Sequence, residues 1–119
     1  MDDAKPDFLA RRWKLILFLV WLVTSSYLIF ERWMPIQWFA LGDTDDNMRI
    51  MQVRALLHGQ DWSDLRQYRL NLPEGANIHW SHLVDLPIAG IILLTKPLFG
   101  GILAEKIAVT LAPLIPLAV

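Results

Sequence analysis

Residues 41–59 read LGDTDDNMRIMQVRALLHG, and the rest of the chain is organised around this stretch. Asp43 or Thr44 is a good helix N-cap, and Gly59 stands where a left-handed C-cap is expected. The pattern between them predicts a helix over residues 43–58. Its expected apolar face contains Ile50, Val53 and Leu57.

Three carboxylates crowd the start of this helix, namely Asp43, Asp45 and Asp46. The positive end of a helix favours acidic residues by about 0.3–1 kcal/mol each, so a capping role for all three is one interpretation. A cap needs only one short polar residue, however. Asp45 is four residues before Arg49, a spacing that predicts an ion pair between them. Asp43 and Asp46 therefore remain candidates for a chemical role.

The composition is that of a membrane protein. Of the 119 residues, 55% are hydrophobic, and the mean hydropathy is +0.36. The net charge of −1 and the lack of a basic cluster argue against nucleic acid as a partner. The chain has no Cys, which excludes disulfides and cysteine-based metal sites.

The first membrane span is predicted at residues 13–33, with Trp13 and Trp33 at its two interfaces. A cleaved signal peptide is the alternative, although the apolar run is longer than usual for one. Basic residues are concentrated before the span. The positive-inside rule therefore places residues 1–12 in the cytoplasm and the acidic helix outside it.

Residues 34–82 are too polar to cross a bilayer and are predicted to form an extracytoplasmic loop. Arg66 and Arg69 of this loop could meet phosphate or lipid head groups, although solvated loop arginines are commoner. At the end of the loop, His79, His82 and Asp85 recur every three residues. They could bind a divalent metal if helical, but they are also ordinary residues at a membrane interface.

Two further spans are predicted at residues 83–99 and 102–119, separated by two glycines. Glu105 and Lys106 should then lie near the cytoplasmic end of the third span. Pro113 and Pro116 fall in its apolar part and need neighbouring helices to pair the freed carbonyls. Because the sequence stops within this apolar run, we expect the third span to be incomplete. The predicted fold class is an all-α integral membrane protein.

The order of these features resembles the N-terminal portion of GT-C-type membrane glycosyltransferases. In the oligosaccharyltransferases of this group, the first outer loop opens with an Asp that is followed by Asn and Arg. Asp43, Asn47 and Arg49 match that spacing. Thr44, Asp45, Asp46 and Met48 replace the family's Pro and aromatic residues. Residues 42–49 and 79–87 are also similar to uncharacterised bacterial multi-spanning proteins of this kind.

The resemblance implies a protein of the bacterial inner membrane that transfers a sugar from a polyprenyl-phosphate-linked donor on the extracytoplasmic side. Asp43, and next Asp46, would be the general base or would hold Mg²⁺ or Mn²⁺. Arg66 and Arg69 are the weaker candidates for contacting the donor phosphate. The 119-residue chain, as an N-terminal fragment of such a protein, should by itself have no sugar-transfer activity. The alternative is a small non-catalytic membrane protein whose outer loop binds a partner protein.

Overall fold

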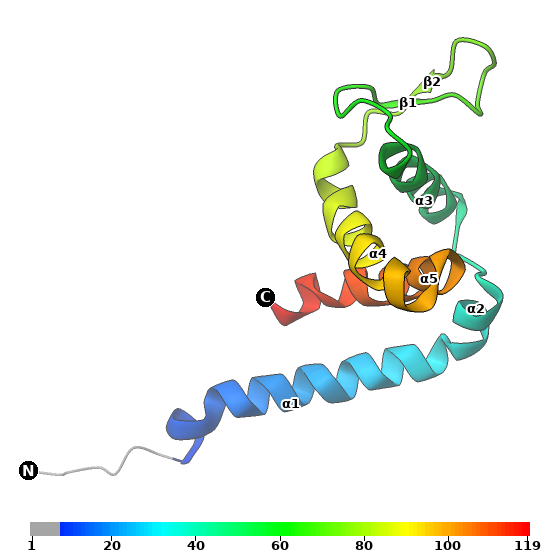
Figure 1. Ribbon diagram of the computed structural model, residues 1–119. Helices are drawn as coiled ribbons and strands as arrows, with labels where there is room; N and C mark the ends of the chain where they lie inside the picture. Colours follow the sequence, from blue (N-terminus) through cyan, green and yellow to red (C-terminus); the bar gives the residue numbers. More distant parts are fainter. Residues whose placement is uncertain (1–7) are drawn as a thin grey trace, which may run out of the picture.

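The computed structural model describes residues 8–119, and these are mostly helical (Figure 1). The α-helices are α1 (Phe8–Glu31), α2 (Trp33–Trp38), α3 (Thr44–Leu57), α4 (Leu86–Phe99) and α5 (Gly101–Leu111). Three short 3₁₀ helices are η1 (His82–Asp85), η2 (Ala112–Leu114) and η3 (Pro116–Ala118). The strands are β1 (Arg66–Gln67) and β2 (Ala76–Asn77).

Three helical stretches are long and apolar enough to cross a membrane. They are Arg11–Glu31, His82–Phe99 and Gly101–Ala118. This agrees with the predicted all-α membrane class and places the three stretches close to the predicted spans. The orientation of the N-terminus and the assignment of residues 34–82 to the outer face stay predictions.

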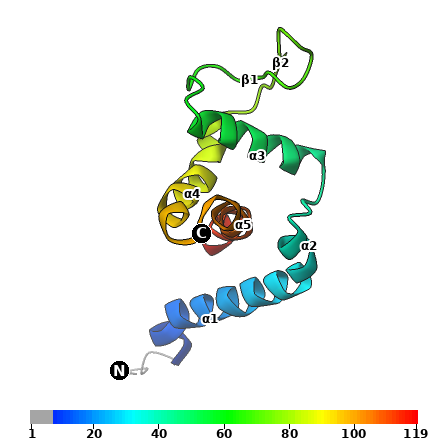
Figure 2. The same cartoon turned by 45° about the vertical axis from the view of Figure 1, so that its right-hand side comes forward.

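A sharp change of direction separates α1 from α3. The helix α1 ends at Glu31, two residues before the predicted end of the first span, and the short helix α2 follows. Phe39 closes α2 in the left-handed conformation, with φ of 54°. Its backbone N–H bonds to carbonyls of the last turn of α2, which is a common way to end a helix. The chain then enters α3 in a new direction (Figure 2).

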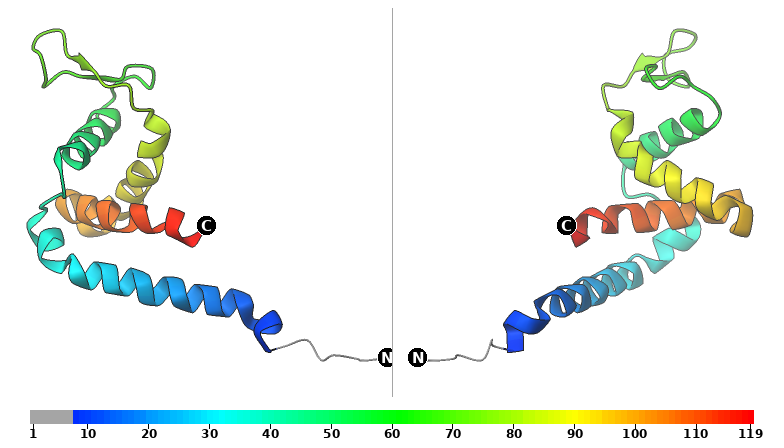
Figure 3. Two further views of the ribbon diagram at one scale, coloured as in Figure 1. Left: turned by 180° about the vertical axis from the view of Figure 1, so that it is seen from behind. Right: turned by 60° about the vertical axis from the view of Figure 1, so that its left-hand side comes forward.

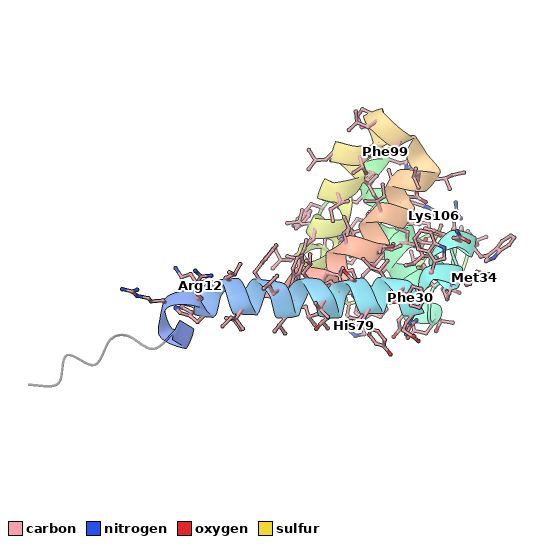
Figure 4. All side chains as sticks on the ribbon, turned by 90° about the horizontal axis from the view of Figure 1, so that it is seen from below. Arg12, Phe30, Met34, His79, Phe99 and Lys106 are labelled. Atoms are coloured by element: carbon pink, nitrogen blue, oxygen red, sulfur yellow. The ribbon has the colours of Figure 1, made fainter. Side chains whose placement is uncertain are left out.

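The helices α4 and α5 form a tight hairpin that extends away from α1, with Phe99 at its far tip (Figure 4). Gly100 makes the turn with φ of 80°. On α5 and the turn after it, Ala104, Ala108 and Ala112 are all buried. Small residues at every fourth position let helix backbones approach closely in a membrane.

The core joins the hairpin to α3, which crosses the start of α4 (Figure 2). Its buried members are Ile50, Val53, Ala89, Ile92, Ala104 and Ala108. The predicted apolar face of α3 therefore packs against both C-terminal helices rather than against lipid alone. These buried side chains are apolar and need no hydrogen-bond partner. The contact between α3 and the helical hairpin can therefore also form inside a membrane.

The two strands were not expected from the sequence. They pair antiparallel, with Arg66 opposite Asn77 and Gln67 opposite Ala76. This small sheet lies at the opposite end of the molecule from α1 (Figure 3). Strands of two residues are too short to produce an alternating pattern, which is why the sequence predicted only a loop here.

Pro113 and Pro116 have a neighbour that the sequence did not reveal. The indole N–H of Trp21 on α1 donates to the carbonyl of Leu114 at 3.1 Å. The helix α1 therefore contacts the segment that contains the two prolines. The carbonyls that a Pro leaves free lie three to four residues before it, so Leu114 is not one of them.

Candidate functional site

The acidic start of α3 contains a well-formed helix cap. Asp43 has an extended backbone, and its Oδ1 accepts a hydrogen bond from the backbone N–H of Asp46 at 2.9 Å. The side chain of Asn47 donates to the Asp43 carbonyl at 2.7 Å. These bonds pair groups that a helix start leaves free, so Asp43 has a structural role whatever else it does.

The four-residue spacing predicted an ion pair between Asp45 and Arg49, but this pair does not form. Arg49 instead reaches across to the start of α4, where its Nη1 lies 2.8 Å from Oδ1 of Asp85. Arg49 pairs with Asp85 because Asp85 is completely buried and needs a charged partner, whereas Asp45 is exposed to solvent.

The second oxygen of Asp85 is also occupied. His82 Nδ1 lies 2.8 Å from Asp85 Oδ2, and the His82 side chain is only 3% exposed. The other ring nitrogen of His82 lies 3.4 Å from the carbonyl of Asp64 in the loop. The carboxylate thus joins a cation of α3 to a histidine that contacts the loop before β1.

Two tryptophans border this buried cluster. The guanidinium of Arg49 lies over the ring of Trp80, 4.9 Å from its centre, in a cation–π contact. The ring of Trp62 is 5.5 Å from that of His82. The orientation of the Arg49 guanidinium is therefore set both by its ion pair with Asp85 and by its contact with Trp80.

A pocket opens between the end of α1, α2, the start of α3 and the end of α5. Its volume is about 320 Å³. Its walls are mainly apolar, and Arg32 and Asp46 are its charged residues. The apolar lining includes Leu28, Ile36, Phe39, Val109, Pro113 and Leu114. Such a pocket suits an apolar chain that ends in a charged group.

A smaller pocket of about 150 Å³ adjoins the larger one, and the two share four lining residues. The shared residues are Leu41, Asp46, Val109 and Pro113. The small pocket adds Arg49, Ile50 and Ile88. Asp46 therefore lines both pockets, together with Arg32 in the larger one and with Arg49 in the smaller one.

Gly42 leaves room at the junction of the two pockets. A methyl group added at Gly42 would lie 3.4 Å from Oδ2 of Asp46 and 3.7 Å from Nη1 of Arg32. The missing side chain lets both charged groups approach the same backbone position. A larger residue here would occupy the space between them.

The other predicted site residues lie elsewhere. Asp43 lines neither pocket, and Arg66 and Arg69 are on the hairpin of the small sheet. Arg66 Nη1 approaches the carbonyl of Glu74 at 3.4 Å, and Arg69 lies near the sulfur of Met51. The structure thus gives no support to a shared phosphate site for the two arginines and Asp46.

The metal hypotheses have a limited basis in these residues. Across residues 8–119, no group of three or more His, Asp or Glu side chains is placed to hold a metal ion. In the predicted trio, His82 and Asp85 meet, but His79 does not join them. Mg²⁺ is commonly held by one or two carboxylates together with phosphate and water, so a hard oxygen donor such as Asp46 fits an ion that arrives with its substrate.

Contacts between the loop and α5 are also unexpected. The guanidinium of Arg54 on α3 forms a two-pronged ion pair with Glu105, and this bonding raises the pKa of Arg54. Lys106 donates to the carbonyl of Gln37 on α2. The sequence placed Glu105 and Lys106 at the cytoplasmic end of a span and α3 on the other side. In the structure Glu105 contacts α3 through an ion pair whose side chains are partly exposed, and Lys106 contacts α2.

Two groups in or just before the hairpin have shifted pKa values. Ser63 donates from its hydroxyl and its backbone N–H to Asp61, which lowers the pKa of Asp61. Tyr68 donates to Asp64 at 2.7 Å, which raises the pKa of Tyr68. Both contacts organise the loop locally, and neither group lines a pocket.

Sequence reasoning missed the roles of Arg32, Gly42 and Asp85. Arg32 was not considered as a site residue, and Asp85 was considered only as a metal ligand or as an ordinary residue of a membrane interface. A signal did exist for Asp85, because a charged residue beside an apolar helix commonly needs a partner of opposite charge.

A comparison with protein-family models, with curated proteins and with solved structures gave no match.

Proposed function

We propose that this chain is the N-terminal part of a membrane glycosyltransferase that takes a sugar from a polyprenyl-phosphate-linked donor. The observation that carries the proposal is the position of Asp46, a carboxylate that lines two adjoining apolar pockets, one together with Arg32 and the other together with Arg49. Three apolar helices of membrane-spanning length are consistent with a lipid-linked substrate. The motif of Asp43, Asn47 and Arg49 supports the same assignment.

The chemistry assigns the apolar pocket to the isoprenoid chain and its charged rim to the phosphate. During transfer, the bond between the sugar carbon and the phosphate oxygen breaks, and a bond to the acceptor oxygen or nitrogen forms. The acceptor proton goes to a carboxylate, and Asp46 is the better placed of the two candidates. Asp43 is committed to capping. A Mg²⁺ or Mn²⁺ ion bound by Asp46 would neutralise charge on the leaving phosphate.

In this proposal the protein resides in the bacterial inner membrane with its N-terminus in the cytoplasm. The start of α3 then faces the extracytoplasmic side, where the donor lipid presents its sugar. The basic residues before α1 support this orientation.

The test is sugar transfer by the full-length protein that carries this sequence, in membranes supplied with a polyprenyl-phosphate sugar. Asp46→Asn should lower transfer by about 10²-fold or more, the usual scale for loss of a general base, with little change in thermal stability. Asp43→Asn keeps a good N-cap side chain and should lower transfer less. Asp45→Asn is the matched control, because Asp45 lines neither pocket. Normal transfer by Asp46→Asn would remove the basis of the assignment.

A partner-binding loop is the second candidate, and the hairpin favours it. Tyr68 and Leu72 are 44% and 76% exposed there, and Trp62, which precedes β1, is 49% exposed. A protein of this class would show no transfer in the same assay. Substituting the exposed hairpin residues would then impair function, whereas Asp46→Asn would not.

A further inference from the structure

The cluster around Arg49 extends the proposed site beyond its carboxylates. The Arg49 guanidinium has five N–H donors, and Asp85 Oδ1 accepts from its Nη1 at 2.8 Å. Trp80 stacks on one face of the group. The ion pair and the ring together hold a planar cation in one orientation, with donor capacity left over.

That cation lines the small pocket, where Asp46 is the only other charged residue. Arg32 and Asp46 both line the larger pocket. Asp85 balances the charge of Arg49, but it uses only one of the N–H donors of this guanidinium. An arginine fork matches the oxygen geometry of phosphate, so the remaining donors favour a phosphate group at the junction of the pockets.

The surrounding walls restrict the kind of phosphate compound. Both pockets are lined mostly by aliphatic residues, and they share four residues, so one ligand can occupy both. A free phosphate ion would leave the apolar lining of the larger pocket unused. An isoprenoid phosphate would bury its chain there and gain free energy from the removal of apolar surface from water.

We infer that Arg49 is a phosphate-binding residue for an isoprenoid phosphate, with Asp85 and His82 as positioning residues that hold it through buried hydrogen bonds. This inference rests on the proposed function for the identity of the lipid. It assigns the phosphate to Arg49 and Arg32, not to Arg66 and Arg69. The isoprenoid chain lies in the larger pocket, and the phosphate lies beside Asp46.

The position of the Arg49 guanidinium depends on the negative charge of the buried Asp85 carboxylate. An uncharged acceptor could still bond to Arg49, but it would hold the cation less firmly. His82 occupies the second oxygen of Asp85, which prevents the carboxylate from rotating. The same histidine contacts the carbonyl of Asp64, so the loop contributes to the placement of Arg49.

The experiment measures binding to the 119-residue chain in nanodiscs of phosphatidylcholine by isothermal titration. Farnesyl phosphate is the probe. Farnesol tests the apolar pocket alone, and inorganic phosphate tests the charged junction alone. The parent chain should bind farnesyl phosphate at least 10-fold more tightly than either of the other two compounds.

Three variants separate recognition from folding. Arg49→Lys and Asp85→Asn should weaken farnesyl phosphate binding by about 10-fold and leave farnesol binding unchanged. Gly42→Val should weaken the binding of both farnesyl phosphate and farnesol, because the added side chain enters the space beside Asp46 and Arg32. Arg54→Lys is the matched control on the same helix. It pairs with Glu105, lines neither pocket, and should change farnesyl phosphate binding less than 2-fold.

The inference is overturned if Arg49→Lys binds farnesyl phosphate like the parent, or if it weakens farnesol to the same extent. Equal affinity for inorganic phosphate and farnesyl phosphate would overturn the choice of an isoprenoid ligand. Binding requires no sugar transfer, so the two proposals fail separately. Loss of transfer activity without loss of phosphate binding would count against the proposed function alone.

Discussion

The helices α1 and α3 are held in place by different forces. In the apolar stretch of α1 only 6% of the residues are buried in the protein, and one hydrogen bond, from Trp21, joins it to the C-terminal segment. The helix α3 contributes Ile50 and Val53 to the core and forms ion pairs with two other elements. The position of α1 therefore depends mainly on its surroundings, whereas that of α3 depends on specific contacts.

This difference follows from the medium. Lipid tails are as apolar as the side chains of α1, so burial between helices supplies no hydrophobic driving force inside a bilayer. Polar groups behave in the opposite way, because an unpaired charge away from water is costly. The charged residues on α3 and α5 are consequently held by specific partners, whereas the apolar residues of α1 need none.

Removal of Asp85 should have the largest effect on this contrast. Asp85→Ala leaves Arg49 and His82 without their shared acceptor. Loss of one member of a buried ion pair should destabilise the packing of α3 by about 3 kcal/mol. Hydrogen exchange in detergent should accelerate in α3 and remain unchanged in α1.

The neighbouring variant Leu83→Ala is a suitable control, since Leu83 is 66% exposed. Equal acceleration of exchange in α1 and α3 by Asp85→Ala would show that the two helices share one source of stability.

The ion pair between Arg54 and Glu105 should have an intermediate effect. Its side chains are 38% and 18% exposed, so solvent weakens the attraction, but the two-pronged geometry strengthens it. A double-mutant cycle with Arg54→Leu and Glu105→Leu should yield a coupling energy of about 1 kcal/mol in unfolding measurements.

Arg69→Leu combined with Glu105→Leu is the corresponding control and should show additive effects. Additivity for Arg54 and Glu105 as well would mean that α3 does not depend on α5 for its position.

The smallest effect is expected at the attachment of α1. Trp21→Phe keeps an aromatic ring but removes the N–H that donates to Leu114. Hydrogen bonds between helices in membranes contribute about 0.6 kcal/mol, so α1 should separate from the C-terminal segment more often without unfolding. Because the chain has no Cys, spin labels at Leu17→Cys and Leu117→Cys can measure the distance distribution.

Trp33→Phe should leave that distribution unchanged, since Trp33 is 52% exposed. An unaltered distribution in Trp21→Phe would show that the hydrogen bond does not attach α1.

Much of the fold could be read from local patterns. The apolar runs, the cap at Asp43 and the glycine break at residue 100 all depend on neighbouring residues, so they are visible without a structure. The two-residue strands were missed because they have no periodic pattern. The support of Leu114 by Trp21 joins residues far apart in the chain, which no local pattern reveals.

The sequence by itself determined the helices, the acidic helix start and the residue types available for chemistry. The tertiary structure decided which of those residues meet. It paired Arg49 with Asp85 rather than Asp45, and it placed Asp46 rather than Asp43 at the pockets. The physical reason is that a helix cap is a local interaction, whereas a buried charge takes the partner that the packing of distant elements brings within reach.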